Sequence, residues 1–452
     1  MNIIKHVFEF MLIESIYLLG FFNNKLKIHL INKMKIRKMR AICTHAFHNS
    51  LFYRESFFAH GILEKDLRSL TFEQLPVVKK SDIVENIQDV FTDKTLNKDD
   101  VFDYIYNGST EKAYQNKYIC FTTSGTLGLK MPVLLAINDF KTFVFNTFLY
   151  NSKPFKILLG KKTKVAMLGA VEGRSAGIAF IKNLPKSIFE TKEISLLLPI
   201  DKIINELNEF SPEQLVSYPG VFCSLIPYKE SGALTISPKK IVLSGEILTE
   251  ENAERINKAF NCEISNSYGA SECLIMGVKK NKNPYRLYHN ICNVEILDKD
   301  NKPAKEGELG RIVITNFVNY SQPIIRYDIG DFAVSTMNKH GEMTFDGVSG
   351  RNNKPIFFKG NKGEQVELFY IALYSLFLFS SGIYKSQMLI GENSIKALIV
   401  GTNECIAKCE INMEKLLRSN GVDQTVNFFI EKVEDILPDS NGKIPFIKFQ
   451  SS

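Results

Sequence analysis

The stretch Tyr118-Ile-Cys-Phe-Thr-Thr-Ser-Gly-Thr-Leu-Gly-Leu-Lys130 places hydroxyl groups and glycines directly behind a short apolar run. The apolar run, residues 118–121, predicts a strand that presents the following loop at its C-terminal end. Hydroxyls and unshielded glycine amides can approach a phosphate closely, although most such clusters are ordinary solvated loops. The stretch alone therefore leaves a phosphate-binding loop and a solvated loop both open.

Further motifs follow this loop along the chain. They are Ser244-Gly245-Glu246, Asn266-Ser267-Tyr268-Gly269-Ala270-Ser271-Glu272, Arg326-Tyr327-Asp328-Ile329-Gly330-Asp331, Gly350-Arg351 and Asn441-Gly442-Lys443. With the loop, they resemble the adenylate-forming enzymes, which share a Thr-Ser-Gly-Thr loop, Tyr-Gly-x-Thr-Glu, Tyr-x-x-Gly-Asp, Gly-Arg and a late Gly-Lys in this order.

The N-terminal half indicates a branch of this superfamily. Phe52-Tyr53-Arg54, Leu75-Pro76-Val-Val-Lys79-Lys-Ser81-Asp82 and Ser217-Tyr218-Pro219-Gly220 are similar to the phenylacetate-CoA ligase-like family, which includes capsular polysaccharide biosynthesis proteins. The resemblance spans residues 45–450.

The resemblance implies a set of residues that bind ATP and AMP. They lie in the hydroxyl-rich loop and in the later motifs: Thr123, Ser124, Gly125, Thr126, Gly128, Ser244, Gly245, Glu246, Asn266, Ser267, Tyr268, Gly269, Ser271 and Asp331. Tyr268 is expected in the wall of the adenine pocket, where it is able to stack. Asp331 is expected to accept hydrogen bonds from the ribose hydroxyls.

The resemblance also implies catalytic residues and a metal. Glu272 stands where the family's acidic residue holds Mg²⁺, an ion that keeps several waters and needs few carboxylates. Lys443 is expected to bridge the substrate carboxylate and the α-phosphate, as a compact point charge. Arg351 is the third expected catalytic residue, and Asn353 stands at the hinge of a mobile lid.

Several positions depart from the family pattern. Leu127 stands where a second Thr is common, and Ile329 replaces the usual Thr before Gly330-Asp331. Lys130 precedes Met131-Pro132 instead of following a proline, so no role is transferred to it. The paired acids of the hinge are replaced by Asn352-Asn353. These departures put the rate of lid rotation in doubt.

Strand and helix patterns alternate through the middle of the chain. Strands are predicted at 164–168, 214–218, 240–243, 263–267 and 311–315, with helices at 201–209 and 249–260. This alternation predicts an α/β fold with a parallel-rich sheet flanked by helices. Ligand sites in such sheets lie at the carboxyl ends of the strands, where the loop 122–128 and the turn 268–272 would both lie.

The pattern changes after Gly350. Helices are predicted at 364–379 and 404–419, and strands at 387–390, 395–400 and 425–430. We therefore expect a large N-terminal domain over residues 1–350, with a helical extension over 1–45, and a small mobile α+β lid domain over 351–452.

Composition narrows the class of protein. The 452 residues carry a net charge of only +7, so nucleic acid is not the expected partner. The eight cysteines include no Cys-x-x-Cys pair, which predicts buried thiols in a reducing compartment, no structural zinc site and a cytoplasmic location.

The apolar segment 7–22 contains Glu9 and Glu14 and lacks a small-residue cleavage site, so it predicts a helix docked on the body of the protein. The alternative is weak peripheral membrane contact through residues 1–40. The basic residues that would face anionic lipid are Lys25, Lys27, Lys33, Lys35, Arg37, Lys38 and Arg40.

The predicted function is ATP- and Mg²⁺-dependent activation of a small carboxylic acid as an acyl-adenylate, with release of pyrophosphate. The acyl group would then pass to a thiol, that of coenzyme A or of the phosphopantetheine on an acyl carrier protein. The charged loop 169–174 suits a polar acid and equally suits plain solvation.

Two alternatives remain at this stage. One is an amide-forming ligase that delivers the acyl group to an amine. The other is a catalytically silent homologue that acts as a binding or membrane-associated partner. Retention of Glu272, Asp331 and Lys443 together argues against the silent homologue.

Overall fold

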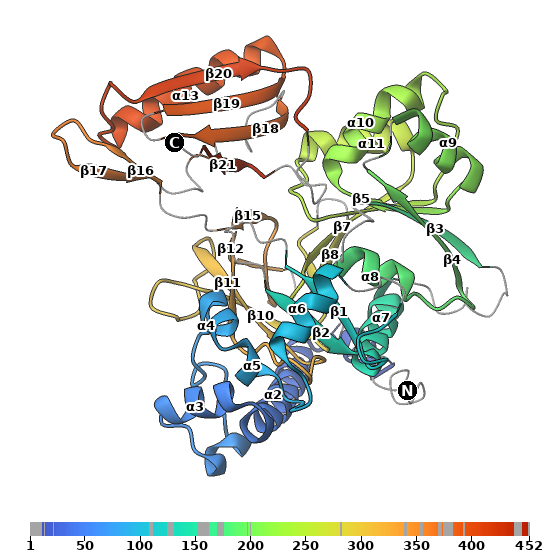
Figure 1. Ribbon diagram of the computed structural model, residues 1–452, viewed down its shortest axis with the longest axis vertical. Coiled ribbons are helices and arrows are strands. Elements are labelled where there is room, and N and C mark those ends of the chain that lie inside the picture. The colour runs from blue at the N-terminus through green and yellow to red at the C-terminus, as the bar shows by residue number, and fades with distance from the viewer. Residues whose placement is uncertain are drawn as a thin grey trace. The chain divides into compact units, whose positions relative to one another are not determined.

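The computed structural model describes residues 11–12, 14–20, 22–107, 112–123, 131–151, 162–169, 176–196, 198, 200–280, 283–338, 341–351, 356–368, 373, 383–391, 394–437 and 445–450. The chain forms two compact units, drawn as ribbons in Figure 1. Unit 1 is Met1–Met167, Val171–Glu193 and Ser265–Val348, and unit 2 is Leu168–Ala170, Ile194–Ile264 and Ser349–Ser452. The domain boundary at residue 350 stays a prediction.

Unit 1 begins with helices. They are α2 (Asn24–Asn49), α3 (Leu51–Ala59), η1 (Glu64–Arg68), α4 (Lys80–Glu85), α5 (Ile87–Val90) and α6 (Lys98–Asn107). The Asn23 side chain accepts a hydrogen bond from the Leu26 amide at 3.0 Å and so caps α2. α2 buries one face, which includes Ile42, Cys43 and Ala46.

The N-terminal helical segment is docked on the protein, as predicted. Residues 14–19 are helical, Ile16 is buried, and Glu14 pairs with the Arg286 guanidinium at 2.9 Å. The same guanidinium lies 4.6 Å from the centre of the Tyr17 ring. No helix among the described residues is long and apolar enough to cross a membrane.

Part of the basic segment faces the protein. Lys27 is 2% exposed, and its ammonium lies 3.0 Å from the Glu342 carboxylate. Arg40 donates to the Leu70 carbonyl at 3.0 Å, and burial lowers the pKa of Lys35. These cations are used inside the fold, so the expectation that they could face anionic lipid is wrong for them. Three others are exposed: Lys25, Lys33 and Arg37.

The hydroxyl-rich loop follows a hairpin strand. β1 (Tyr118–Thr122) pairs antiparallel with β2 (Pro132–Ala136) in a two-stranded sheet, and α7 (Ile137–Asn151) follows. The prediction that this loop ends a strand of the parallel sheet is therefore wrong. The hairpin itself holds Thr123 at the end of β1.

A seven-stranded sheet has the order β4-β3-β5-β6-β7-β8-β9. Its strands are β3 (Thr163–Gly169), β4 (Phe189–Ser195), β5 (Gln214–Ser217), β6 (Lys240–Ser244), β7 (Glu263–Ala270), β8 (Leu274–Lys280) and β9 (Arg286–Leu287). β5 and β6 are parallel, whereas β7 is antiparallel to β8 and β8 is antiparallel to β9. The predicted strands of this region are confirmed.

Helices separate the strands of this sheet along the chain. They are α8 (Ala176–Lys182), α9 (Ile200–Phe210), α10 (Pro219–Glu230) and α11 (Glu250–Phe260). The Thr249 hydroxyl accepts from the Asn252 amide at 3.1 Å, and Glu250 and Glu251 lie in the first turn, so α11 begins where the sequence predicts. The α/β fold class is confirmed.

A second sheet includes three strands of unit 1, β10, β11 and β12, two of which carry residues of the candidate site. Its order is β10-β11-β12-β15, and β10 to β12 are antiparallel. The strands are β10 (Cys292–Leu297), β11 (Leu309–Asn316), β12 (Tyr327–Val334) and β15 (Val348–Arg351), with a small hairpin of β13 (Thr336–Met337) and β14 (Met343–Thr344).

The C-terminal part is α+β, as predicted. A four-stranded sheet has the order β20-β19-β18-β21, with β18 (Ile383–Ile390), β19 (Ser394–Gly401), β20 (Asn427–Lys432) and β21 (Ile447–Phe449). Helix α13 (Asn403–Ser419) buries Cys405, Cys409, Met413 and Leu417 in its core. The described cysteines are all free, and Cys262 is the half-buried one.

One C-terminal prediction is wrong. Residues 365–368, expected at the start of a helix, form strand β17 (Gln365–Leu368), which pairs with β16 (Ile356–Lys359). β16 alternates buried Ile356 and Phe358 with exposed neighbours, and Gly363 at φ +83° closes the hairpin turn. Of residues 369–379 of that predicted helix, only Leu373 is described.

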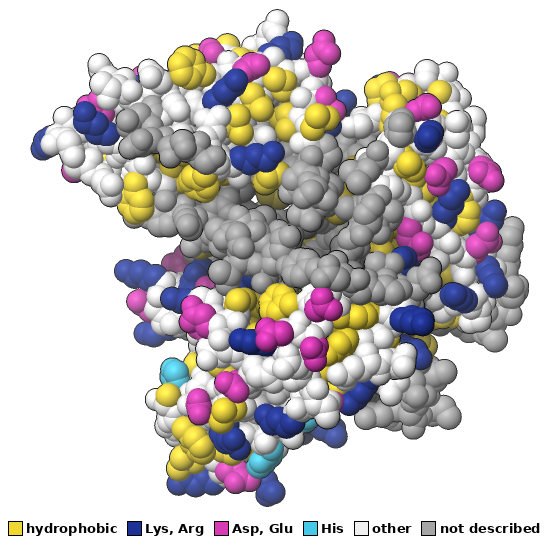
Figure 2. Space-filling view, viewed as in Figure 1, with side chains coloured by type: hydrophobic (Ala, Val, Ile, Leu, Met, Phe, Trp, Pro, Cys, Tyr) yellow, Lys and Arg dark blue, Asp and Glu magenta, His cyan; other side chains and the backbone are white. Residues whose placement is uncertain are grey.

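Acidic and basic side chains are interspersed over the face of the molecule shown in Figure 2. This mixed charge fits the small net charge of the sequence.

Gly269 gives a test of the backbone beside the candidate site. The strand pairing shifts register between Tyr268 and Gly269, and a Cβ at position 269 would lie 2.1 Å from the Leu274 carbonyl oxygen. We expect Gly269→Ala to lower the free energy of unfolding by about 1–3 kcal/mol, because the clash is with backbone. Urea denaturation measures this. Gly347→Ala is the matched control, since nothing lies within 4 Å of its added Cβ. Equal stability of the two variants would contradict the expected clash at this register shift.

Candidate active site

Two predicted site residues, 63 positions apart, meet in unit 1. The Tyr268 hydroxyl, on β7, donates to Asp331 Oδ2, on β12, at 3.0 Å, and both residues are buried. The Tyr268 ring makes edge contacts with Phe345 and Tyr285, at centroid distances of 5.3 and 6.0 Å. The aromatic cluster therefore fixes the ring, and its hydroxyl fixes the Asp331 carboxylate.

The Glu272 carboxylate is buried and only partly satisfied. The side chain is 3% exposed, and Oε1 accepts from the Tyr327 hydroxyl at 3.1 Å. Oε2 has no hydrogen-bond partner among the described residues. A buried carboxylate oxygen without a donor is costly unless another group, such as a cation, satisfies it. The turn that carries Glu272 begins after Ala270, because β7 extends further than predicted.

Thr123 anchors the start of the hydroxyl-rich loop. Its hydroxyl accepts from the Lys80 ammonium at 2.7 Å and from the Met131 amide at 3.0 Å. Its own amide donates to the Met131 carbonyl at 3.0 Å. These bonds fix both ends of the loop and bring a cation to its entrance. Lys80 lies in the motif Leu75–Asp82, but sequence position alone assigns it no role; the paired lysines after Pro76 are the signal that indicates it.

Glu246 caps a helix in unit 2. Its Oε2 accepts from the Gly220 amide at 3.0 Å, at the N-terminus of α10, and so links two of the quoted motifs. Gly245 has φ +80°, a conformation that favours glycine. Ser217, just before α10, donates from its hydroxyl to the Leu168 carbonyl at 2.9 Å. Nucleotide binding by Glu246 stays a prediction beside this capping role.

Arg326 has a structural role in its motif. It is buried at φ +44°, and its guanidinium donates to the Leu75 carbonyl at 2.6 Å and contacts Glu295 at 3.3 Å. The neighbouring Asp328 pairs with Arg311 at 2.6 Å. The two pairs hold the first residues of β12, from which Tyr327 and Asp331 extend.

The other predicted site residues fall into two groups. Four lie on β7 or in the turn after it: Asn266, Ser267, Gly269 and Ser271. Ser244 ends β6, and the backbone of Arg351 ends β15. The remaining predicted site residues lie outside the described residues: Ser124, Gly125, Thr126, Gly128, Asn353 and Lys443. The structure therefore brings together Tyr268 with Asp331 and orients Glu272, and it leaves the other assignments as predictions.

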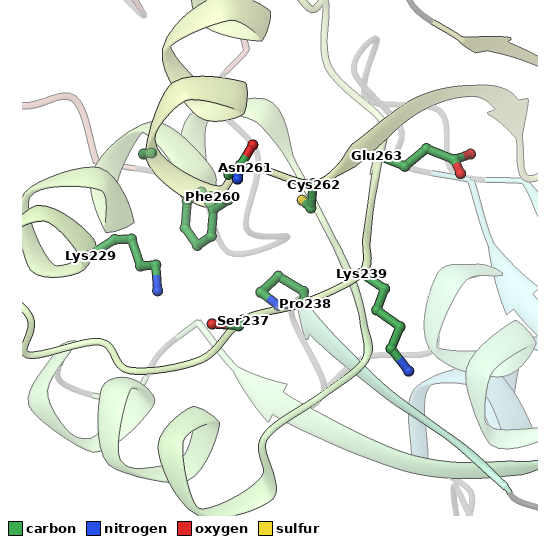
Figure 3. A pocket seen from close by; sticks show the side chains of 9 residues that line it. Lys229, Ser237, Pro238, Lys239, Phe260, Asn261, Cys262 and Glu263 are labelled. Carbon is green, nitrogen blue, oxygen red and sulfur yellow. The ribbon is translucent and has the colours of Figure 1, made fainter.

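A surface pocket of about 640 Å³ in unit 2 is separate from these residues (Figure 3). Its lining includes Lys229, Lys239 and Cys262, and none of the predicted site residues. Lys229 donates to the Ile236 carbonyl at 2.6 Å, and Lys239 pairs with Glu213. Both lysines already have protein partners, so we assign this pocket no part in the chemistry.

Comparison with known proteins adds relatives to this geometry. The chain is 26% identical over 299 residues to CapK of Staphylococcus aureus, covering 63% of this chain and 58% of CapK. It is 25% identical over 141 residues to phenylacetate-coenzyme A ligase of Thermus thermophilus, covering 29% of this chain and 31% of that protein. The chain thus spans less than two thirds of either relative. No family model matches the sequence.

Solved structures share the fold over nearly the whole chain. A 2-hydroxyisobutyryl-CoA ligase in complex with 2-HIB-AMP superposes with a TM-score of 0.64 at 16% identity, covering 93% of this chain and 89% of that one. The chain therefore resembles adenylate-forming enzymes in sequence and shares the fold of these solved structures. Klebsiella oxytoca NpsA, solved with 3-hydroxyanthranilyl-AMSN, matches the chain with a TM-score of 0.51 at 14% identity, covering 72% of this chain and 68% of that one.

Proposed function

We propose that this chain activates a small carboxylic acid with ATP and then transfers the acyl group to a thiol. The observation that carries the proposal is Glu272: its carboxylate lies in the Tyr-Gly-x-x-Glu motif, is buried, is oriented by Tyr327, and has no donor to Oε2 among the residues that the structure describes. Such an oxygen suits a cation brought in by a nucleotide.

The residues at Glu272 fit Mg²⁺ as the family holds it. The described residues include no group of three or more His, Cys, Asp or Glu side chains that could hold a metal. Phosphate oxygens and water would therefore supply the other ligands, as is usual for this ion. When bound, Mg²⁺ would neutralise phosphate charge while an anionic acid approaches.

The reaction consists of two balanced steps. In the first, a carboxylate oxygen of the acid attacks the α-phosphorus of ATP, and pyrophosphate leaves. In the second, a thiolate attacks the acyl carbon, and AMP leaves with the former carboxylate oxygen. Both steps join groups that must be aligned, and the first joins two anions, so positioning and charge neutralisation supply most of the catalysis.

The chain's own residues have distinct parts in this proposal. Asp331, fixed by Tyr268, would accept hydrogen bonds from the ribose hydroxyls. Lys80, whose ammonium donates to Thr123, would supply a cation for the nucleotide phosphates. Lys443 would bridge the acid and the α-phosphate in the adenylating state.

The relatives support the branch and the acceptor. The similarity to CapK and to phenylacetate-coenzyme A ligase supports the phenylacetate-CoA ligase-like branch. One solved neighbour, the 2-hydroxyisobutyryl-CoA ligase, was captured with 2-HIB-AMP and CoA in the thioesterification state, with a TM-score of 0.56. We therefore propose coenzyme A as the first thiol to test and a carrier-protein phosphopantetheine as the second.

Acid-dependent exchange of labelled pyrophosphate into ATP tests the proposal. A panel should include aromatic, fatty, hydroxy and amino acids, followed by assays with coenzyme A, carrier protein and amines. We expect exchange with at least one class of acid and thioester formation with a thiol. Product with an amine but never with a thiol would support the amide-forming alternative instead, and no exchange with any acid would support the silent homologue.

The proposed lid gives a further prediction. Asn353→Pro fixes the backbone at the expected hinge, so it should slow thioester formation by an order of magnitude or more and leave pyrophosphate exchange largely intact. Asn353→Ala is the matched control, because it removes the same side chain without restricting the backbone. Equal loss of both half-reactions in the proline variant would contradict a two-state lid.

A further inference from the structure

Glu272 is held at two points, by its carboxylate and by its backbone. Tyr327 donates to the carboxylate, and Asn316 Nδ2 donates to the Glu272 carbonyl oxygen at 3.1 Å. Asn316 is 4% exposed and ends β11, whereas Tyr327 begins β12. Two adjacent strands of one sheet therefore restrain both ends of the same residue.

The Asn316 side chain has little freedom of its own. Its Oδ1 accepts from the Val318 amide at 2.8 Å and from the Asn319 amide at 3.1 Å. The oxygen is thus fixed by the turn that follows β11, and this leaves the amide group directed at Glu272. Because the turn fixes Asn316 Oδ1, the position of the turn also determines where Asn316 Nδ2 donates to Glu272.

The same turn is bonded to the hairpin that carries Thr123. The Asn319 side chain donates to the Leu134 carbonyl at 3.0 Å. The Gln322 side chain accepts from the Leu134 backbone amide at 2.9 Å and donates to the Pro132 carbonyl at 3.0 Å. Asn319 and Gln322 are fully buried. The Asn319 Oδ1 also accepts from the Gln322 amide at 3.1 Å. Buried amides thus link the Glu272 peptide to β2, the strand after the hydroxyl-rich loop.

We propose that Asn316 is a positioning residue, which sets the direction of the Glu272 Oε2 oxygen relative to the β1–β2 hairpin. This inference rests on the proposed function, in which the Glu272 oxygen is a metal ligand. Partners that orient a metal ligand typically change metal affinity by about 10–100-fold when removed. A purely structural asparagine would change stability alone.

Asn316→Asp separates these two roles. The aspartate keeps an oxygen for the Val318 and Asn319 amides but places an acceptor against the Glu272 carbonyl in place of a donor. Asn316→Ser is a second variant, whose short hydroxyl can serve the turn but does not reach Glu272. Asn290→Asp is the matched control, since Asn290 is also buried and its side chain donates to Asn146 Oδ1, at 2.8 Å, and not to Glu272.

The measurement is calorimetric binding of α,β-methylene-ATP with Mg²⁺ and with EDTA in its place. The ratio of the two affinities is the Mg²⁺ enhancement, which is independent of turnover. We expect Asn316→Asp and Asn316→Ser to lower this enhancement about 10-fold, toward that of Glu272→Gln, with little change in affinity in EDTA. Asn290→Asp should keep the wild-type enhancement while its Tm falls.

The outcomes separate the two proposals. A wild-type enhancement in both Asn316 variants, with its loss in Glu272→Gln, overturns the role of Asn316 and leaves the proposed function intact. An equal loss in Asn290→Asp also overturns it, because the effect would then follow from any buried amide. A wild-type protein that shows no binding of the analogue, or no Mg²⁺ enhancement, overturns the proposed function and the positioning role with it.

Discussion

Replacing Glu272 or Asp331 with alanine is expected to lower acid-dependent pyrophosphate exchange by about 10²-fold or more, the scale of losing one preorganised transition-state contact. Glu272→Ala removes the buried oxygen that we propose as the metal ligand. Asp331→Ala removes the carboxylate that Tyr268 holds at 3.0 Å. We expect the two losses to have separate causes, one at the phosphates and one at the ribose.

Controls must show that these losses are local. Glu85→Ala removes an exposed acid at the end of α4 and should leave exchange unchanged. Tyr268→Phe keeps the ring in its cluster and removes only the hydroxyl, so its rate of pyrophosphate exchange should lie between those of wild type and Asp331→Ala. Near wild-type exchange in folded Glu272→Ala or Asp331→Ala would remove the ATP-site assignment.

Lys443→Ala is expected to separate the two half-reactions. Acyl-adenylate formation should be lost, because the variant lacks the ammonium that we propose bridges the acid and the α-phosphate. Chemically supplied acyl-adenylate should still be consumed with the right acceptor, since the thiol step does not use this lysine. Rapid-quench assays of each step give the comparison.

A matched variant sharpens this test. Lys448→Ala removes a lysine that lies close to Lys443 in the sequence, on β21, and should leave both half-reactions intact. Equal loss of both steps in Lys443→Ala would point to damage of the lid, or to a different role for the residue.

Local sequence patterns predicted most of the architecture. The apolar runs of β5, β6 and β7 and the cap at Thr249 are short-range signals, and the structure confirms them. The strand at 365–368 was missed because its conformation depends on pairing with β16, which no local periodicity reveals.

The candidate site was less predictable for the same reason. Motif position indicated Glu272 and Asp331, but the choice of Tyr268 and Tyr327 as their donors depends on which strands lie side by side. The capping bond of Glu246 to Gly220 joins residues that sequence spacing does not relate. The bond between Lys80 and Thr123 could not be predicted either, because it depends on where the hairpin of β1 and β2 lies in the fold.

The most direct test of the account is the fate of the acid's oxygen. The acid that supports exchange is labelled with ¹⁸O in its carboxylate and converted to thioester under single turnover. Adenylation moves one labelled oxygen into AMP, because the attacking carboxylate oxygen leaves with the nucleotide. We predict one ¹⁸O in the phosphate of AMP by mass spectrometry. Label in inorganic phosphate with formation of ADP, or unlabelled AMP, would contradict activation through an acyl-adenylate.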